Sequence, residues 1–361
     1  MRILNLLPDQ GGGIESYYEK LRPHLDGGVE YFVCGKRPGE HSLVQQAKRL
    51  LTDYLLYWIR LRSKNYDLVV VNPSLETKGI LREGLFILLA SICDVKSIVF
   101  FHGWRPITEN QIEHTWMNLF MSTYGIRTSA VIVLADTIRK KLIGWGLRQN
   151  IYLECTVVDD QVSAHDVRSY IEERLSTIAW RILFLARIGK SKGIYEALDT
   201  FKLLVRRHPE MELMIAGDGE ELANVKQAVV RDLIPNVTFY GYVRGVRKDD
   251  LYRKAHCYLL PSYTEGMPNT VLEAMAFGLP VITRPVGGIK DFFENGRHGF
   301  ATWSLDPLRF AAFIETLHTD RRLWKEISFN NRNFALSRFL ASDAAQRLES
   351  IYREVIGRKK I

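Results

Sequence analysis

The chain has 361 residues, 47% of them hydrophobic and 25% charged, and this composition is typical of a globular protein with two domains of ~150 residues each. The formal net charge of +8 favours anionic partners. The sequence contains neither a zinc-finger spacing nor a basic region with heptads, so we do not expect nucleic acid among them.

The cysteine spacing and the lengths of the apolar runs indicate the cellular compartment in which we expect the protein. The four cysteines are scattered without a C-x-x-C motif, which argues against a disulfide framework or a cysteine zinc site and favours a reducing compartment. The N-terminal MRILNLLPDQ is too short an apolar run for a signal peptide, and Asp94 and Lys96 interrupt the longest apolar stretch. We therefore expect a cytoplasmic protein without a membrane span.

The first half of the chain alternates short apolar runs with helical patterns. Strands are predicted at 2–7, 29–34, 67–72, 97–102, 130–135 and 150–158. Helices are predicted at 14–24, 42–63, 78–91, 110–123 and 136–145. Continuous apolar runs separated by helices indicate parallel strands that are covered on both faces.

A glycine loop, Gly11 to Gly13, joins the first predicted strand to the first helix. Glycines at this place let backbone N–H groups approach an anion, and the helix N-terminus favours negative charge. A dinucleotide fingerprint requires glycine at position 16, where this chain has Ser16. The loop is therefore either an anion-binding turn or a tight turn without a ligand.

The second half repeats the alternation after a polar, helical stretch at about 160–180. Strands are predicted at 181–186, 211–217, 236–241, 256–261 and 280–284. Helices are predicted at 193–207, 219–230, 247–254, 268–277, 288–295, 306–316, 320–337 and 342–358. The pattern predicts an α/β protein with two doubly wound, Rossmann-like sheets, whose ligands bind beyond the carboxyl ends of the strands, in the cleft between the domains.

Two loops of the second half carry candidate site residues. Arg187 and Lys192 follow the strand at 181–186 and suit a diphosphate, since arginine binds oxygens in pairs and lysine acts as a point charge. In PSYTEGMPNTVLEAMAFGLP, Pro268 favours a helix start, so Glu265 lies in the loop before the helix and Glu273 on its second turn. Two carboxylates around an anion-binding helix end suit a sugar nucleotide.

These motifs resemble glycosyltransferase family 4, whose fold is the two-domain GT-B fold. The resemblance covers nearly the whole chain and is most specific over 181–302, in LFLARIGKSKG, IAGDGE, VTFYGYV and EGMPNTVLEAMAFGLPVITRPVGG. It implies an acceptor-binding domain at 1–165 and a donor-binding domain at 166–341, and we expect the helix at about 342–361 to pack back on the first. TVVDDQVS replaces the Pro-Asn-Gly turn that relatives often have near the end of the first domain.

The resemblance also implies roles for individual residues. Arg187 and Lys192 correspond to the basic pair on the donor diphosphate, Glu265 to the glutamate on the transferred sugar, and Glu273 to the glutamate on the ribose. His102, in FFHGW, corresponds to a histidine near the transferred sugar. The remaining donor-binding positions are Gly12, Gly13, Tyr242, Val243, Gly266, Met267, Pro268, Asn269 and Thr270.

The implied reaction is retaining transfer of a sugar from a nucleotide diphosphate sugar to an acceptor hydroxyl, in surface-polysaccharide or lipid-linked glycan biosynthesis. No Asp-x-Asp follows a strand, so we expect no metal requirement and no cofactor. Two alternatives stay open, a GT-B sugar-nucleotide epimerase and an inactive sugar-nucleotide-binding subunit. The first lacks the Glu-x7-Glu pair, and retention of all five charged or histidine site residues argues against the second.

One helical stretch suggests a membrane contact. Residues 47–64 contain Lys48, Arg49, Arg60, Arg62 and Lys64 together with leucines and aromatic residues. In relatives that use lipid-linked acceptors the first domain docks on the bilayer, and a basic, aromatic-rich helix there suits anionic lipid on the inner face of the membrane. The alternative is that the apolar residues pack on the sheet and the cations are only solvated.

Overall fold

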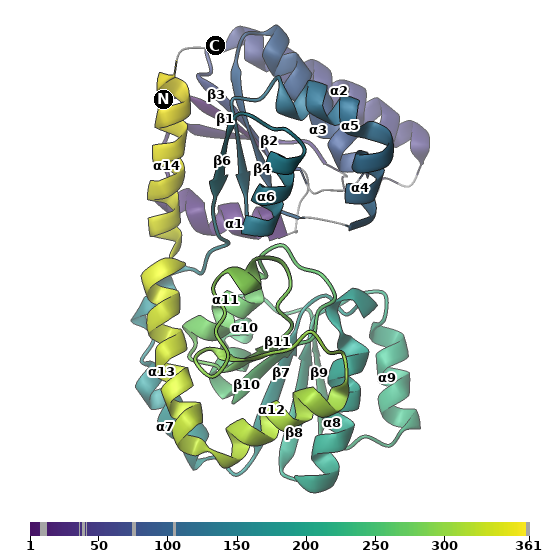
Figure 1. Cartoon of the computed structure of the whole chain (residues 1–361), viewed down its shortest axis with the longest axis vertical. Helices are drawn as coiled ribbons and strands as arrows, with labels where there is room; N and C mark the ends of the chain where they lie inside the picture. The colour runs from purple at the N-terminus through teal and green to yellow at the C-terminus, as the bar shows by residue number, and fades with distance from the viewer. Residues whose placement is uncertain are drawn as a thin grey trace. The chain divides into compact units, whose positions relative to one another are not determined.

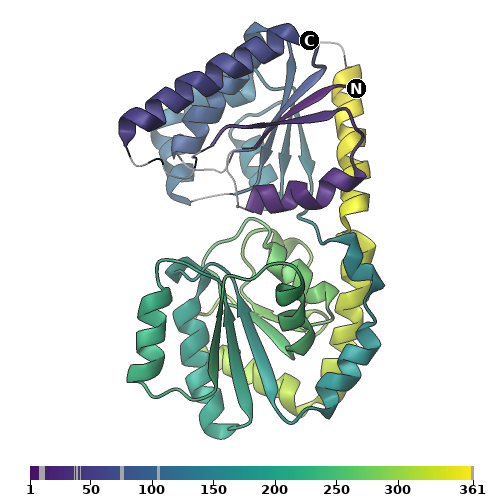
Figure 2. The same ribbon diagram turned by 180° about the vertical axis from the view of Figure 1, so that it is seen from behind.

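A computed structural model describes residues 1–7, 13–35, 37, 40, 42–73, 77–103 and 106–358. The chain divides into two compact units. The first unit comprises Met1–Val157 and Ala341–Ile361, and the second comprises Val158–Leu340. Each unit contains a six-stranded sheet with helices on both of its faces (Figures 1 and 2).

The sheet of the first unit is parallel, with strand order β2-β1-β3-β4-β5-β6. Its strands are β1 (Ile3–Leu7), β2 (Val29–Val33), β3 (Leu68–Val71), β4 (Lys96–Phe101), β5 (Ala130–Val133) and β6 (Asn150–Leu153). The order reverses between β1 and β3, as in a doubly wound sheet. Three strands are buried along their whole length because helices cover both faces.

Helices of the first unit fall into two groups. One face carries α2 (Leu43–Ser63), α3 (Thr77–Ile92), α4 (Pro106–Gln111), α5 (Met117–Phe120) and α6 (Asp136–Gly144). α1 (Gly13–Leu21) packs beside α14 (Ala341–Gly357), whose last carbonyls accept hydrogen bonds from Lys96 Nζ of β4. One π-helical turn joins α4 to α5 and a second follows α5, so this helical segment is longer and less regular than the helix predicted at 110–123.

The second unit has the same design, with strand order β12-β11-β10-β7-β8-β9, all parallel. Its strands are β7 (Trp180–Leu185), β8 (Met211–Ala216), β9 (Val237–Gly241), β10 (Cys257–Leu260), β11 (Val281–Thr283) and β12 (Gly299–Ala301). Its helices are α7 (Val167–Ser176), α8 (Ile194–Arg207), α9 (Leu222–Arg231), α10 (Val246–Lys254), α11 (Asn269–Ala276), α12 (Pro307–Thr319) and α13 (Arg321–Arg338). α8 packs against α12, and α11 packs against α13.

The sixth strand of the first unit is shorter than predicted and ends at Leu153 instead of residue 158. Glu154 turns away to accept hydrogen bonds from Arg347 of α14 at 2.9 and 3.0 Å. Val158 pairs with Leu340, and Arg332 donates to the carbonyls of Ser163 and His165. These contacts assign the segment from Val158 onward to the second unit, whereas the first predicted domain extended to residue 165.

In the second unit, one predicted helix was wrong and one strand was missed. The predicted helix at 288–295 is a single 3-10 turn, Gly287–Asp291, because Gly287 has φ +58° and the N–H of Gly288 donates to the carbonyl of Gly266. The edge strand β12 was not predicted, since three residues are too few to show a periodic pattern. No helix in the described ranges is long and apolar enough to cross a membrane.

Candidate active site

The loop after β7 is held tightly against the end of β10. Gly193 has φ +73°, and a Cβ atom there would lie 2.2 Å from the carbonyl oxygen of Pro261. The N–H of Tyr263 donates to the carbonyl of Ser191 at 2.9 Å. Only glycine fits at position 193, and this fit fixes the position of the neighbouring Lys192.

Lys192 and Glu265 form the centre of the candidate site. The ammonium of Lys192 lies 2.7 Å from both carboxylate oxygens of Glu265, and the hydroxyl of Ser262 donates to Oε1 of Glu265 at 2.7 Å. The side chain of Glu265 is 6% exposed and that of Lys192 is 28% exposed. A cation and a carboxylate therefore come together beyond the carboxyl ends of two paired strands, β7 and β10.

The other cations of this loop differ in their surroundings. Arg187 is exposed, and its guanidinium has no ion-pair or hydrogen-bond partner among the residues that the structure describes. Lys190 is also exposed, and its ammonium lies 3.7 Å from Glu221. Arg187 is thus available to an anion.

A third loop, after β11, completes the arrangement. A Cβ atom at Gly287 would lie 2.2 Å from the carbonyl oxygen of Glu265 and 2.3 Å from that of Gly266. The N–H of Gly288 donates to the carbonyl of Gly266 at 2.6 Å. Gly287 and Gly288 therefore pack closely against the backbone at Glu265 and Gly266. The sequence analysis did not single out these two glycines.

Helix α11 begins at Asn269, directly after Pro268, as predicted. The hydroxyl of Tyr258 donates to Oγ1 of Thr270 at 2.7 Å. The side-chain oxygen of Asn269 is buried and accepts no hydrogen bond from the described residues. The hydrogen bond from Tyr258 thus fixes the start of α11, and the side-chain oxygen of Asn269 remains an acceptor without a donor among the described residues.

Glu273 lies on the second turn of α11 and is only 7% exposed. Its carboxylate accepts hydrogen bonds from the ammonium of Lys248 at 2.8 Å and from the hydroxyl of Tyr252 at 3.0 Å. Burial opposes the charge of Lys248, but the nearby Glu273 outweighs it and raises the pKa of the lysine. A carboxylate oxygen can accept more than one hydrogen bond, so internal partners do not exclude a ligand hydroxyl.

Tyr242 and Val243 follow β9, which is separated from β7 by β8. Tyr242 is 62% exposed, and its hydroxyl accepts a hydrogen bond from Arg244. Both residues lie at the same edge of the sheet as Lys192. Within the described part of the chain, no hydrogen bond or ion pair joins either of them to Lys192 or Glu265.

His102, in the first unit, follows β4 and is enclosed by aromatic rings. Its ring centroid lies 3.9 Å from that of Phe100 and 5.2 Å from that of Tyr17. Nε2 of His102 lies 3.0 Å from Oδ1 of Asn72. Burial lowers the pKa of His102 to about 3, so its imidazole is neutral at physiological pH.

The glycine loop of the first unit is described only in part. Gly13 is the first residue of α1, and a Cβ atom there would meet no heavy atom within 4 Å. Neither space nor a positive φ thus requires glycine at position 13. Gly12 lies outside the described residues.

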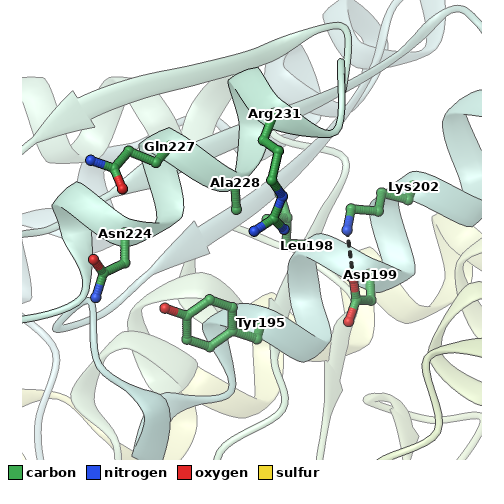
Figure 3. Close-up of a pocket in the computed structure, with 8 residues that line it drawn as sticks. All are labelled: Tyr195, Leu198, Asp199, Lys202, Asn224, Gln227, Ala228 and Arg231. Carbon is green, nitrogen blue, oxygen red and sulfur yellow. Dashed lines mark hydrogen bonds and ion pairs between the residues drawn. The ribbon is translucent and has the colours of Figure 1, made fainter.

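A groove of about 630 Å³ lies between α8 and α9 (Figure 3). Its cations are already paired, since Lys202 contacts Asp199 and Asp232 and Arg231 contacts Asp232. None of the predicted site residues lines it. The lining residues are Tyr195, Leu198, Asp199, Lys202, Asn224, Gln227, Ala228 and Arg231.

A family model matches the unit that carries these loops. Residues 172–334 match the family model described as "Glycosyl transferases group 1". The capsular polysaccharide biosynthesis glycosyltransferase CapM of Staphylococcus aureus is 24% identical over 297 residues, which are 78% of this chain and 76% of CapM. An uncharacterized glycosyltransferase of Haemophilus influenzae is 36% identical over 153 residues, but that match spans 42% of this chain and 43% of the relative.

A structural comparison covers both units. The crystal structure of Anabaena HepE in complex with UDP-glucose is similar over 98% of this chain and 100% of its own, with a TM-score of 0.77 and 18% identity. The fold of this protein is the GT-B fold, as predicted. The family match, the relatives and the fold together support the GT-B glycosyltransferase superfamily and the glycosyltransferase class of enzyme.

Proposed function

We propose that this protein is a retaining, family 4-like glycosyltransferase that moves a sugar from a nucleotide diphosphate sugar to an acceptor hydroxyl. The observation that carries the proposal is the contact of Lys192 with Glu265 where the loops after β7, β10 and β11 meet. The group 1 family match includes this site. CapM, whose name refers to capsular polysaccharide biosynthesis, favours a surface-polysaccharide or lipid-linked glycan as the acceptor.

In the proposed reaction, the bond between the anomeric carbon and the diphosphate oxygen breaks while a bond to the acceptor oxygen forms on the same face of the sugar. The acceptor proton passes to the departing phosphate oxygen, so the products are a glycoside and a nucleoside diphosphate. Negative charge grows on the diphosphate during this step. In this proposal, Arg187, Lys192 and N–H groups at the start of α11 stabilise that charge.

The carboxylates have different tasks in this proposal. Glu265 accepts hydrogen bonds from hydroxyls of the transferred sugar, whose charge changes during the reaction. Glu273 accepts hydrogen bonds from the ribose, which does not change, and Tyr242 and Val243 flank the base. His102 contributes beside the transferred sugar as a neutral imidazole.

The cations of the site also support a reaction without a metal. Two basic side chains and a helix N-terminus offer the leaving diphosphate the positive charge that a divalent ion supplies elsewhere. We expect turnover to survive EDTA, followed by assay in metal-free buffer. Turnover that falls with EDTA and returns with Mg²⁺ or Mn²⁺ contradicts this part of the proposal.

The decisive experiment measures release of nucleoside diphosphate from a panel of UDP- and GDP-sugars in the presence of candidate acceptors. Lys192→Ala should lower kcat by about 30-fold or more, since a charge-assisted contact contributes about 2–3 kcal/mol. Lys190→Ala is the matched control, because Lys190 lies in the same loop but is exposed. Equal turnover in the two variants refutes the diphosphate assignment.

The same assay separates the alternatives. A sugar-nucleotide epimerase consumes donor without an acceptor, and an inactive binding subunit binds donor without releasing nucleoside diphosphate. Glu265 and Glu273 each accept a hydrogen bond from a lysine of the second unit, and these bonds support a role for both carboxylates in the donor site. We therefore expect acceptor-dependent release.

We also propose that α2 contacts anionic lipid and thereby brings the protein to a membrane-bound acceptor. Tyr57 and Leu61 of this helix face the core, whereas much of its apolar surface faces outward. The exposed residues are Leu43, Val44, Leu51, Leu55, Leu56, Trp58 and Ile59. This distribution argues against the alternative that the apolar residues of α2 only pack on the sheet.

The basic residues of α2 are not equally available for lipid. Arg60 and Lys64 both bind Glu30, at 2.5 and 2.9 Å, and Arg49 binds Glu40 at 2.9 Å. Arg62 is exposed, with its guanidinium 5.3 Å from the ring of Trp58. Arg62 and Lys48 are therefore the cations that α2 offers an anionic surface.

Liposome sedimentation at low salt tests this contact. Leu55→Ser together with Arg62→Glu should release the protein from vesicles that contain anionic lipid, and salt should weaken binding of the natural sequence. The matched control is Arg139→Glu, a half-exposed charge on α6 that pairs with Asp136. A protein that stays in the supernatant with anionic vesicles at low salt has no lipid contact of this kind.

A further inference from the structure

A second cluster of chemically active side chains lies at the amino end of β8, at the opposite sheet edge from the donor loops. His208 caps the C-terminus of α8, and Glu210 follows in the tight turn in which the N–H of Met211 donates to the carbonyl of His208. His318 lies in the last turn of α12, which packs against α8. Three elements thus bring two imidazoles and one carboxylate together.

The separations between these groups match a metal coordination shell. Nε2 of His318 lies 3.3 Å from Oε1 of Glu210, and Nδ1 of His208 lies 3.6 Å from the same oxygen. One ligand atom from each residue lies within 4.8 Å of the other two. Ligands at about 2.0–2.1 Å from a tetrahedral Zn²⁺ are themselves roughly 3.3–3.4 Å apart, so the side chains need little movement to bind an ion.

A carboxylate orients His208, and burial limits which nitrogen His318 can present. Nε2 of His208 faces Oε1 of Glu315 at 3.5 Å, and Arg207 holds that carboxylate at 3.0 Å. A carboxylate on the second nitrogen is the usual partner of a metal-binding histidine. Nδ1 of His318 is buried without a hydrogen-bond partner among the described residues, so Nε2 is the nitrogen that it presents to Glu210.

The cluster is also accessible and has suitable charge. The side chains of His208, Glu210 and His318 are 23%, 32% and 22% exposed, so an ion and a water molecule can reach them. Two imidazoles and a carboxylate are ligands that suit Zn²⁺ better than Mg²⁺ or Ca²⁺.

We propose that His208, Glu210 and His318 bind a divalent transition metal, with Zn²⁺ preferred and water as the fourth ligand. The ion joins the end of α8, the start of β8 and the end of α12. This site is independent of the proposed sugar transfer, because it contains none of the residues that would contact the donor. Its effect is on the stability of the second unit.

The test uses full-length protein without a polyhistidine tag, stripped with a chelator and dialysed. Zinc is titrated in competition with a chromophoric chelator, and bound metal is counted by elemental analysis. We expect one Zn²⁺ per chain, a higher Tm with zinc, and a visible absorption band with Co²⁺. Cu²⁺ bound at this site should quench the fluorescence of Trp180, because the ring of Trp180 lies 5.0 Å from that of His318.

Variants identify the ligands. His318→Gln and Glu210→Gln should each weaken zinc binding by about 100-fold or more, and Glu315→Gln by about tenfold. Glu212→Gln is the matched control, because Glu212 lies two residues further along and pairs with Arg181 instead. Glu210 is at the surface, so its variant tests the site even if His318→Gln fails to fold.

A cluster of simple ion pairs gives different results. In that case the natural protein binds no stoichiometric zinc, or the Glu210→Gln and Glu212→Gln variants bind it equally. Either result overturns the proposed site. Nucleoside diphosphate release by the Glu210→Gln variant should equal that of the natural protein, so failure here is distinct from failure of the proposed function.

Discussion

Asn72 determines which nitrogen of His102 carries the proton. The amide nitrogen of Asn72 donates to Oδ1 of Asn5 and to the carbonyl of Leu6, and its oxygen accepts the hydroxyl of Tyr18. The same oxygen faces Nε2 of His102, so Nε2 must donate to it. Nδ1 is therefore the acceptor nitrogen, and His102 is poorly suited to act as a general acid.

The first prediction concerns this tautomer. In ¹⁵N-histidine NMR spectra, His102 should show a protonated Nε2 and should not titrate between pH 8 and pH 5, since its pKa is about 3. Asn72→Asp should raise that pKa, because a carboxylate stabilises the imidazolium. Exposed histidines in the same spectrum provide the reference. A titration of His102 near pH 6.5 in the natural protein contradicts the assignment.

Glu273 and Lys248 form a pair that links the donor site to the stability of α10 and α11. Their side chains are 9% and 23% exposed, and the carboxylate has a second internal donor in Tyr252. Removal of either partner leaves the other charge poorly compensated in a largely buried place. The lysine thus positions a residue that, in the proposed function, touches substrate.

The second prediction separates binding from turnover. Glu273→Gln should raise the donor KM by about tenfold or more with little change in kcat, whereas Glu265→Gln should lower kcat, because only contacts to the transferred sugar change in the transition state. Lys248→Met should lower the free energy of unfolding by about 1–3 kcal/mol and also raise KM. The exposed Lys254→Met on the same helix is the control. Steady-state kinetics with the reverse pattern refute these roles.

Part of the site was visible in the sequence because its residues lie in short motifs after strands. Arg187, Lys192 and Glu265 lie in loops after strands of the second unit, and Glu273 lies on the helix that follows the last of these loops. Lys248 was not visible, because its only signal is a lysine on a polar helix whose partner lies 25 positions later. The roles of all these residues stay predictions.

At the scale of elements, three loops meet because glycines remove side chains at the points of contact. Gly287 has a positive φ and a carbonyl oxygen within 2.2 Å of where its Cβ would be. Gly296 also has a positive φ, +79°, but its Cβ would meet nothing within 4 Å. Alanine substitutions at Gly296 and Gly287 therefore distinguish the cost of backbone strain alone from the cost of strain together with a steric clash.

The third prediction compares them. Gly296→Ala should lower the free energy of unfolding of the second unit by about 1–2 kcal/mol through backbone strain alone. Gly287→Ala should cost more than about 3 kcal/mol and abolish donor binding, because the added methyl group meets backbone that cannot move away alone. Denaturant unfolding and donor calorimetry measure both effects. Equal values for the two variants contradict the proposed support of Glu265 by Gly287.

Elements were predictable where apolar runs were long and uniform. Buried strands such as β3 and β5 appear in the sequence as uninterrupted apolar runs. The end of β6 and the turn at 287–291 were not predictable from the sequence. Contacts with α14 determine where β6 ends, and a contact with Gly266 determines the turn. Local patterns contain no information about such distant partners.

At the scale of the whole molecule, the two units respond differently to acid. In the second unit, burial lowers the pKa of His256 to about 3 and also lowers that of His298. In the first unit, burial lowers the pKa of His102 but raises the pKa of Glu83 to about 7. These two shifts have opposite effects on stability in acid. Unfolded histidines bind protons from about pH 6.5, whereas unfolded glutamates do so only near pH 4.3.

The fourth prediction follows from the signs of these shifts. Between pH 6.5 and 5, protonation of each lowered histidine favours the unfolded state, and each contributes up to roughly 1.4 kcal/mol per pH unit. Protonation of Glu83 favours the folded state and offsets His102. The second unit should therefore lose stability first, as measured by pulse proteolysis with mass spectrometry of the fragments. Earlier loss of the first unit contradicts the prediction.

The position of α14 determines the order in which a growing chain can fold. Its Tyr352 and Leu348 are buried, and Arg347 binds Glu154, yet this helix is synthesised after every strand of the protein. The first sheet leaves the ribosome early but lacks part of its cover until then, while residues 158–340 already hold all of the second sheet. Domains commonly fold in the order of synthesis. In this protein the later unit is the first that can be complete.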